Sequence, residues 1–261
     1  MVIDFHTHCY PDELAAKALR GVDDKREGDA DGTVSGLKKA MAEAGVDLAV
    51  LLPVCAHPGH ERTVNAFASE AAKSGGLIPF FSVHPFSEGA DELIRMYAGM
   101  GMKGIKFHPN MQRFSPRDPR LYHIWRAVKE CGLIAVFHCG RPGVHDTEYD
   151  VYAPDFLPLL GMLDPEKTVL AHTGGYGVSD DDIKILADTG MYTDLSLAPS
   201  QFDDERFGRA LDLLSPDRIL FGSDSPWRDI KHTLDFIKRN VHDERTLEKI
   251  LHLNAEKLLG I

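Results

Sequence analysis

The chain has 261 residues, 43% of them hydrophobic and 26% charged, and its formal net charge at pH 7 is −11. This length and composition predict one large globular domain, residues 1–261, with an ample core. The acidic charge disfavours nucleic acids and anionic membranes as partners, and no apolar run is long enough to span a membrane.

The cysteines and the N-terminus bear on the location of the protein. Cys9, Cys55, Cys131 and Cys139 include no C-x-x-C spacing, and in a chain of this length they do not resemble a disulfide framework. The N-terminus lacks a basic segment followed by an apolar stretch, so no signal peptide is expected. Both observations predict a cytoplasmic protein.

Short apolar runs alternate with amphipathic segments along the chain, which predicts strands followed by helices. The expected strands are residues 2–6, 48–54, 77–83, 104–107, 133–137, 168–171, 191–195 and 218–221. The expected helices are residues 33–44, 61–73, 91–100, 120–131, 155–163, 180–188, 203–214, 229–240 and 245–259. Ser179 is expected to cap the helix at 180–188. Loops that would surround a substrate are expected at 21–32, 110–118 and 140–154.

Eight strand–helix units of similar size in about 250 residues predict an α/β fold of the (β/α)8 TIM-barrel type. The last helix, 245–259, is an addition to the eight units. A doubly wound open sheet is the alternative, but no G-x-G-x-x-G motif follows the first strand. No linker or low-complexity tract indicates a second domain.

The chain opens with the motif Asp4-x-His6-x-His8, directly after an apolar pair. Residues two apart on a strand point to the same side, so His6 and His8 can converge on one point with Asp4 behind them. Imidazole nitrogens are common ligands of zinc. The spacing therefore indicates the first part of a metal site, although an isolated His-x-His is more often two ordinary histidines.

Polar side chains recur at the predicted carboxyl ends of the strands, where the active site of a TIM barrel forms. Six of the 13 histidines lie at such ends, together with a lysine and an aspartate: His6, His8, His84, Lys106, His108, His138, His172 and Asp224. So many at one rim are hard to attribute to chance. The set predicts one polar site there.

This set of side chains suits metal-assisted hydrolysis. A catalytic zinc ion usually has three protein ligands and one position for water, and it lowers the pKa of that water to about 7. A carboxylate beside the water can accept its proton and pass it to a leaving group, a role that suits Asp224. A further histidine can polarise the substrate carbonyl or stabilise the oxyanion.

Five segments, in their order along the chain, resemble the amidohydrolase superfamily. They are Asp4-x-His6-x-His8, Gly104-Ile105-Lys106-Phe107-His108-Pro109, His138, His172-Thr173-Gly174-Gly175 and Gly222-Ser223-Asp224-Ser225-Pro226. Residues 254–259 are also similar to the closing helix of its amidohydrolase-related (amidohydrolase 2) branch, which includes aminocarboxymuconate semialdehyde and resorcylate-type decarboxylases. The resemblance spans nearly the whole chain and implies a TIM-barrel enzyme that uses a divalent metal.

By position, the resemblance implies four ligands of a single divalent metal, expected to be zinc: His6, His8, His138 and Asp224. It also implies that His172 lies beside the metal and acts on substrate or water. Two metals remain an alternative, because some superfamily members bridge two metals with a carboxylated lysine from strand four, where Lys106 lies. His138 and His172 would then share the second metal.

Lys106, His108 and Arg141 are candidates for binding an anionic group of the substrate. A barrel-lining lysine bonded to its neighbours is an equal alternative for Lys106, and a solvated loop residue is one for Arg141. Asp4 is expected either to orient a ligand histidine or to form a salt bridge at the barrel floor. His84 is expected to close its strand rather than to act chemically.

The leading functional hypothesis is a metal-dependent hydrolase of a small amide, lactone or ester, with Asp224 and His172 as catalytic residues. A non-oxidative decarboxylase or hydratase on the same scaffold is the alternative. A phosphoesterase of the histidinol-phosphatase type would need a late Asp-x-His pair, whereas Asp224 is followed by Ser225 and Pro226. A nuclease would need a basic surface, and the intact ligand set disfavours an inactive barrel. Homodimer formation is left open.

Overall fold

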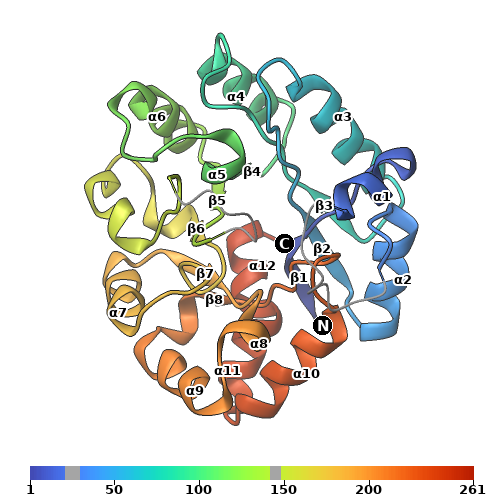
Figure 1. Ribbon diagram of the computed structural model, residues 1–261, viewed down its shortest axis with the longest axis vertical. Helices are drawn as coiled ribbons and strands as arrows, with labels where there is room; N and C mark the ends of the chain where they lie inside the picture. Colours follow the sequence, from blue (N-terminus) through green and yellow to red (C-terminus); the bar gives the residue numbers. More distant parts are fainter. Residues whose placement is uncertain (21–29, 142–147) are drawn as a thin grey trace.

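The computed structural model describes residues 1–20, 30–141 and 148–261. In these residues eight parallel strands form an inner ring, and helices surround it (Figure 1). The strands are β1 (Ile3–Thr7), β2 (Leu48–Leu51), β3 (Leu77–Pro79), β4 (Gly104–Phe107), β5 (Ile134–Phe137), β6 (Thr168–Leu170), β7 (Tyr192–Asp194) and β8 (Ile219–Leu220). All eight overlap the predicted segments, and the (β/α)8 barrel is confirmed.

Two seams join the three-stranded sheet β1-β2-β3 to the five-stranded sheet β4-β5-β6-β7-β8. At one seam the N–H of Phe81 donates to the carbonyl of Gly104 at 3.0 Å, and the N–H of Lys106 donates to the carbonyl of Phe81 at 2.8 Å. At the other seam the N–H of Phe5 donates to the carbonyl of Phe221 at 2.8 Å. β8 and β1 are therefore neighbours although they lie at opposite ends of the sequence.

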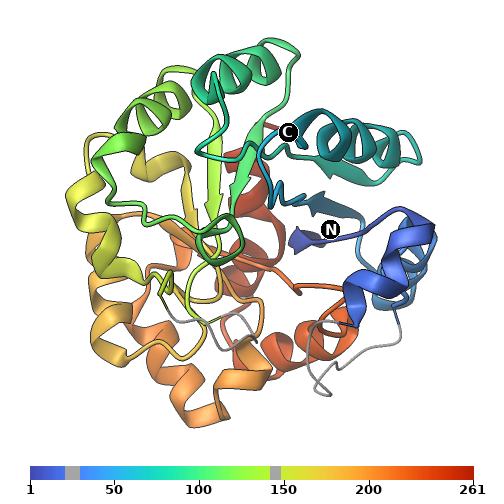
Figure 2. The ribbon, with the colours of Figure 1, turned by 45° about the horizontal axis from the view of Figure 1, so that its top comes forward.

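Seven of the outer helices overlap predicted ones: α2 (Val34–Ala44), α3 (Glu61–Ala72), α4 (Ala90–Gly99), α6 (Tyr122–Glu130), α7 (Asp180–Thr189), α9 (Asp204–Leu213) and α10 (Ile230–Asn240). Figure 2 shows helices around the strands from a second direction. Ser179 caps α7 as predicted, because its hydroxyl accepts a hydrogen bond from the N–H of Asp182 at 3.1 Å. Thr33 and Asp229 cap α2 and α10 in the same way.

The structure differs from the sequence patterns at several short elements. Among the described residues it adds the helices α1 (Asp12–Leu19), α5 (Pro109–Gln112) and α8 (Ala198–Gln201), and the 3-10 helices η1 (Pro119–Leu121), η3 (Pro165–Lys167) and η4 (Pro216–Arg218). All but α1 are too short for a periodic pattern to reveal. The helix predicted at 155–163 is wrong, because a 3-10 helix, η2 (Ala153–Leu159), takes its place. Pro158, inside this segment, lacks the N–H group that a regular α-helix would use to bond to the carbonyl four residues earlier.

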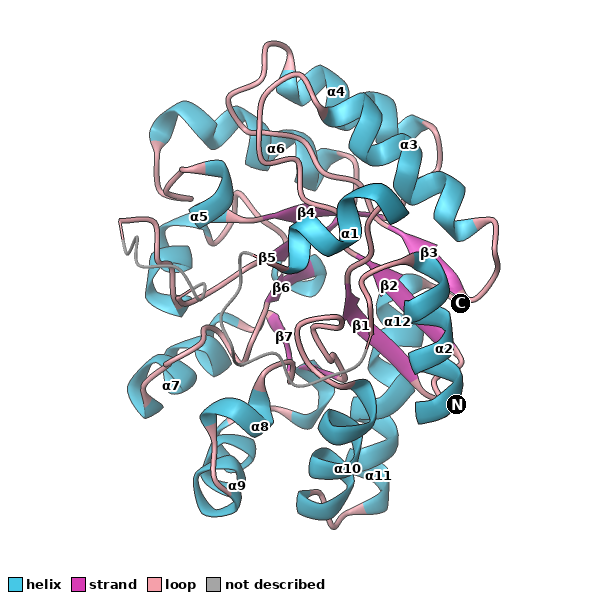
Figure 3. Ribbon diagram, turned by 45° about the vertical axis from the view of Figure 1, so that its right-hand side comes forward, coloured by secondary structure: helices cyan, strands magenta, loops and turns pink. Residues whose placement is uncertain are grey.

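The predicted terminal helix is confirmed but interrupted. α11 (Glu244–Glu248), the π-helical turn η5 (Lys249–Leu253) and α12 (Asn254–Leu259) follow one another. The side-chain amide of Asn254 donates to the carbonyls of Pro216 and Ile219 at 2.8 and 2.7 Å. The ammonium of Lys103 donates to the carbonyl of Leu259 at 2.6 Å. α12 thus lies where β4 and β8 begin, at the end of the barrel opposite to the strands' carboxyl ends (Figure 3).

The loops expected to surround a substrate are described only in part. Residues 21–29 of the predicted loop 21–32, and residues 142–147 of the predicted loop 140–154, lie outside the described residues. The third loop, 110–118, contains most of α5. In the part of the chain that the structure describes, no helix is long and apolar enough to cross a membrane.

Ser82, which follows β3, forms hydrogen bonds to β4 and to the segment that follows β2. Its backbone N–H and carbonyl bond to the side-chain amide of Asn65 in α3, at 2.9 and 3.0 Å. Its hydroxyl donates to the carbonyl of Lys106 at 2.9 Å and accepts from the N–H of Cys55 at 3.0 Å. Because Lys106 lies in β4, Asn65 supports the seam between β3 and β4.

We expect the Asn65→Ala substitution to lower the free energy of unfolding by roughly 2–4 kcal/mol. It leaves the N–H and the carbonyl of Ser82 buried without partners, and each such group costs about 1–3 kcal/mol. Urea unfolding followed by circular dichroism measures the change. The control is Ser69→Ala, which removes an exposed hydroxyl of the same helix and should change stability by less than about 0.5 kcal/mol. Equal effects of the two substitutions would contradict this role of Asn65.

Candidate metal centre

The polar residues predicted at the strand ends converge on one buried site at the carboxyl end of the barrel. Nine side chains form it: His6, His8, Lys106, His108, His138, His172, Asp194, Ser196 and Asp224. Seven of them are predicted from the sequence, whereas Asp194 and Ser196 are not. None of these nine residues as a whole is more than 9% exposed, so the site is largely shielded from solvent.

His6 and His8 turn the same ring nitrogen toward Asp224. The Nδ1 atom of His6 lies 2.8 Å from Oδ2 of Asp194, and that of His8 lies 2.7 Å from the carbonyl oxygen of Leu52. Because a carboxylate and a carbonyl only accept, each Nδ1 carries the proton and each Nε2 keeps a lone pair. The two Nε2 atoms lie 3.5 Å (His6) and 3.2 Å (His8) from Oδ1 of Asp224.

Asp224, like His172 and its neighbour Thr173, adopts an uncommon backbone conformation. The φ angle of Asp224 is 66°, in the left-handed region, and those of His172 and Thr173 are 62° and 60°. Residues other than glycine rarely adopt this region, and the cost of about 1–3 kcal/mol each is typically found at functional sites. The N–H of Asp224 donates to the carbonyl of His6 at 2.8 Å, which holds its carboxylate beside the histidines.

His172 connects the site to two further side chains. Its Nε2 lies 3.0 Å from Nδ1 of His138, and its Nδ1 lies 2.7 Å from Oγ of Ser196. The Nε2 atom of His138 is buried and has no hydrogen-bond partner among the described residues. The ring of His138 also stacks on that of His108, with 3.9 Å between the centroids. His172 therefore has both ring nitrogens engaged, whereas His138 has only one.

Asp194 and Ser196 are the site residues that the sequence patterns missed. Asp194 ends β7 and Ser196 follows two positions later, and both are fully buried. Oδ1 of Asp194 accepts from the N–H groups of His172 and Ser196, each at 3.1 Å, and from the Ser196 hydroxyl. The one available signal was the pair of polar residues, two apart, at the end of the seventh predicted strand.

Burial controls the ionisation of the site. It lowers the pKa values of four histidines well below their usual range: His6, His108, His138 and His172. These rings are therefore neutral at pH 7. Burial also lowers the pKa of the Lys106 ammonium to about 8, while Asp194 and Asp224 act in the opposite direction.

Asp4 steadies His6 through the backbone rather than through the imidazole ring. Its Oδ1 accepts from the N–H of His6 at 3.1 Å and from the N–H of Ser223 at 3.0 Å. Burial raises the pKa of its carboxyl to about 7. Asp4 thus holds β1 next to the segment that follows β8, and its contact with His6 is made through the backbone N–H.

The donor atoms of the site fit a divalent metal ion. One ligand atom from each of His6, His172 and Asp224 lies within 4.8 Å of the others. The Nε2 lone pairs of His6 and His8 face the carboxylate of Asp224, and these electron-rich atoms repel one another unless a cation lies between them. Imidazole nitrogens with a carboxylate oxygen form the ligand mixture that zinc and similar metals prefer.

The three residues predicted to bind substrate lie at different depths. Lys106 is fully buried, with its Nζ 3.2 Å from Nε2 of His6. His108 is buried beside His138. The side chain of Arg141 is 69% exposed, and its Nε lies 3.6 Å from Oδ2 of Asp150. Lys106 and His108 therefore belong to the site, whereas Arg141 lies at the surface.

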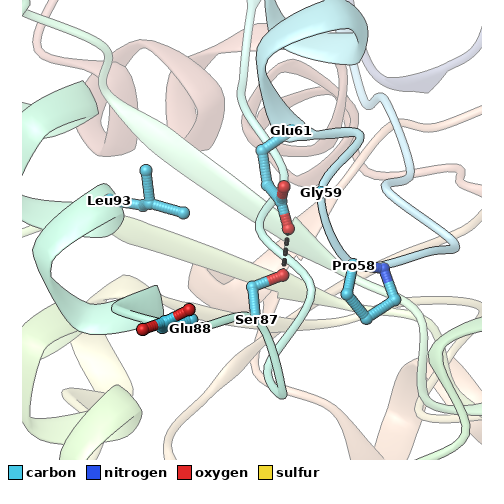
Figure 4. A pocket seen from close by; sticks show the side chains of 6 residues that line it. All are labelled: Pro58, Gly59, Glu61, Ser87, Glu88 and Leu93. Carbon is cyan, nitrogen blue, oxygen red and sulfur yellow. Dashed lines mark hydrogen bonds between the residues drawn. The ribbon is translucent and has the colours of Figure 1, made fainter.

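His84 packs near a separate surface pocket. This pocket, of about 410 Å³, is lined by Pro58, Gly59, Glu61, Ser87, Glu88 and Leu93 (Figure 4). The carboxylate of Glu61 accepts from the Ser87 hydroxyl and from the N–H of His84, the latter at 3.3 Å. Nδ1 of His84 accepts from the N–H of Phe86 at 3.2 Å. These bonds support the expectation that His84 closes its strand.

The match to a known family covers almost the entire chain. A family model described as amidohydrolase matches residues 3–261. The chain belongs to this amidohydrolase family. No curated protein matches it. The motifs that carry the resemblance in the sequence therefore identify the family correctly.

Solved structures share the fold of this amidohydrolase. A TIM-barrel protein from Bordetella bronchiseptica is 19% identical, with a TM-score of 0.79, and the match covers 99% of this chain and 98% of that one. A structure described as a probable 2-pyrone-4,6-dicarboxylic acid hydrolase from Acinetobacter baumannii is 17% identical, with a TM-score of 0.67 and coverage of 100% and 99%. A dihydroxybenzoic acid decarboxylase from Polaromonas sp. JS666, with bound manganese, is 18% identical, with a TM-score of 0.72 and coverage of 99% and 96%.

Gly222 permits the close packing of β1 and β7 in this amidohydrolase. A Cβ atom at position 222 would lie 2.9 Å from Cβ of His6 and 3.2 Å from Cβ of Asp194. We expect Gly222→Ala to lower the free energy of unfolding by about 1–3 kcal/mol through overpacking. The control is Gly208→Ala in α9, where an added Cβ meets nothing within 4 Å and should stabilise by about 0.5–1 kcal/mol. Thermal unfolding measures both, and a stable Gly222→Ala protein would count against the close contact.

Proposed function

We propose that the chain is a metal-dependent hydrolase that adds water to the carbonyl carbon of a small amide, lactone or ester. The observation that carries the proposal is the buried cluster in which Nε2 of His6, Nε2 of His8 and Oδ1 of Asp224 face one another. Three electron-rich atoms at these distances suit a shared cation. Membership of the amidohydrolase family supports the same chemistry.

We infer four ligands for one divalent ion, zinc by preference: His6, His8, His138 and Asp224. His138 is included because its buried Nε2 has no partner among the described residues. Both nitrogens of His172 have hydrogen-bond partners, which favours one ion over two. When bound, the metal supplies a water of lowered pKa and polarises the substrate carbonyl.

Asp224 and His172 are the proposed catalytic residues. The carboxylate of Asp224 accepts the proton of the attacking water and later delivers it to the leaving group. His172, whose ring stacks on that of His6 with 4.8 Å between centroids, lies beside the proposed ligands. Because burial keeps its ring neutral, we propose that it acts on the substrate carbonyl as a neutral imidazole.

The charges in and around the site favour an acidic substrate. Lys106 is a buried cation in the site, and His108 lies beside the proposed ligand His138. Arg141 carries a further positive charge at the surface, near the end of β5. We propose that Lys106 and His108 bind a carboxylate of the substrate inside the site, and that Arg141 attracts the anionic substrate at the surface.

A non-oxidative decarboxylase is the second candidate. The buried ammonium of Lys106 suits the carboxylate of a carboxylated ring as well as that of an acidic ester or lactone. The similar fold of the dihydroxybenzoic acid decarboxylase supports this candidate, just as that of the dicarboxylic acid hydrolase supports the first.

Removal of the metal tests the proposed centre. We expect a chelator to abolish turnover and a divalent metal to restore it. His8→Ala and Asp224→Ala should each retain less than about a tenth of the wild-type metal, because each substitution removes a proposed ligand. Plasma mass spectrometry measures the metal content. His123→Ala, which changes an exposed histidine of α6, should bind as much as the wild type, and full occupancy in the two ligand variants would contradict the assignment.

A substrate panel separates the two candidate reactions. It contains lactones, esters and amides of acidic small molecules together with aromatic and dienoic carboxylates. We expect hydrolysis, detected as incorporation of ¹⁸O from labelled water, and a fall in kcat of about 100-fold or more in Asp224→Asn, which loses the proposed base. Release of carbon dioxide without hydrolysis of any member of the panel would favour the decarboxylase instead.

A further inference from the structure

We propose that Asp194 is a positioning residue that fixes where the protons of three site histidines lie. It acts on His6 by direct contact and on His172 and His138 through Ser196. The result is that Nε2 of His138, like Nε2 of His6, carries a lone pair and is able to bind a metal ion. The role of these proton positions in metal binding rests on the proposed metal centre. The proton positions themselves follow from hydrogen bonds within the protein.

The carboxylate of Asp194 is surrounded by donors. Its Oδ1 accepts from the N–H groups of His172 and Ser196, each at 3.1 Å, and from the hydroxyl of Ser196. Its Oδ2 lies 2.8 Å from Nδ1 of His6. A carboxylate offers about four acceptor positions and no donor. Each of these contacts therefore needs a donor on the other side, and His6 must carry its proton on Nδ1.

Ser196 passes this constraint to His172. Its hydroxyl has one proton, and the contact with Oδ1 of Asp194 takes it, because that oxygen can only accept. The Ser196 oxygen also lies 2.7 Å from Nδ1 of His172. With its proton already committed, the hydroxyl must accept there. His172 therefore carries its proton on Nδ1.

His172 passes the constraint to His138. A neutral imidazole has one donor and one acceptor nitrogen, so a proton on Nδ1 leaves Nε2 of His172 as an acceptor. Its partner at 3.0 Å, Nδ1 of His138, must then be the donor. The second nitrogen of His138 consequently has a lone pair, and it is the buried Nε2 that has no partner among the described residues.

Electrostatics disfavours the opposite set of proton positions, in which each of these hydrogen bonds runs the other way. If Nδ1 of His172 accepted the proton of Ser196, the serine oxygen would turn a lone pair toward Oδ1 of Asp194. Two oxygen atoms in contact with no proton between them repel each other. Nδ1 of His6 is already needed as a donor to the same carboxylate. The set of proton positions in which Ser196 donates to Asp194 and His172 donates to Ser196 therefore gives each of these hydrogen bonds one donor and one acceptor.

Nitrogen-15 NMR of the histidine rings tests this proposal directly, because protonated and unprotonated ring nitrogens have well-separated shifts. In the metal-free wild-type protein we expect the Nδ1-protonated form for His6, His138 and His172. In Ser196→Ala, the Nδ1–H of His172 loses its acceptor, so we expect both His172 and His138 to populate the Nε2-protonated form. The matched control is Thr193→Val, which removes a buried hydroxyl of β7 that bonds to the carbonyl of Leu170 instead.

Zinc affinity, measured by competition with a coloured chelator, gives a second readout. We expect Ser196→Ala to weaken binding by about 10–100-fold, the range typical of residues that orient metal ligands. Asp194→Asn should weaken it at least as much, because an amide cannot accept from both His6 and Ser196. Thr193→Val should bind zinc as tightly as the wild type, which separates positioning from a general loss of stability.

Two results would overturn the proposal. One is a proton on Nε2 of His138 in the wild-type protein, and the other is unchanged histidine shifts in Ser196→Ala. Failure of the proposed function is recognised separately, because it would appear as equal metal content in the wild type and in His8→Ala. The histidine shifts are read without metal and do not depend on that outcome.

Discussion

The hydrogen bonds between the first and the last strand bring the candidate centre together. The N–H of Asp224 donates to the carbonyl of His6 at 2.8 Å, and the N–H of His8 donates to the carbonyl of Ser225 at 2.7 Å. In a closed parallel barrel, residues just beyond each strand share one rim. The carboxylate of Asp224, which follows β8, therefore lies beside the histidine pair of β1 because β8 and β1 are neighbours in the closed barrel. Closure is thus a condition for the site as well as for the fold.

Closure also buries several polar groups, which is costly unless they satisfy one another. Burial keeps the histidines neutral, so only a few full charges remain inside. Of these, Asp194 is balanced by four hydrogen-bond donors, and Lys106 lies beside Nε2 of His6. Among the described residues, the buried ring nitrogen that has no hydrogen-bond partner is Nε2 of His138. A nitrogen lone pair left open within a dense hydrogen-bond network is expected of a ligand-binding centre rather than of a purely structural core.

The order of strands and helices, the barrel and most of the site could be predicted because their signals are local. Apolar periodicity marks the elements, and histidines directly after strands mark the rim. Asp194 and Ser196 escaped prediction because their importance lies in contacts with His6 and His172, which are far away in the sequence. The segment expected as a helix at 155–163 is a shorter 3-10 helix, because Pro158 has no N–H to donate within the apolar pattern. The unpredicted features therefore depend either on contacts between residues far apart in the sequence or on a proline that lacks a backbone N–H.

The same network bears on the number of metal ions. A second ion in the two-metal arrangement would need His172 as a ligand and Lys106 as a carboxylated bridge. His172 already has a partner at each ring nitrogen. Nζ of Lys106 lies 3.2 Å from Nε2 of His6, an interaction that a bridging position would break. A second ion would therefore require both side chains to leave their present interactions, whereas one ion requires only donor atoms that already face Asp224 or have no partner.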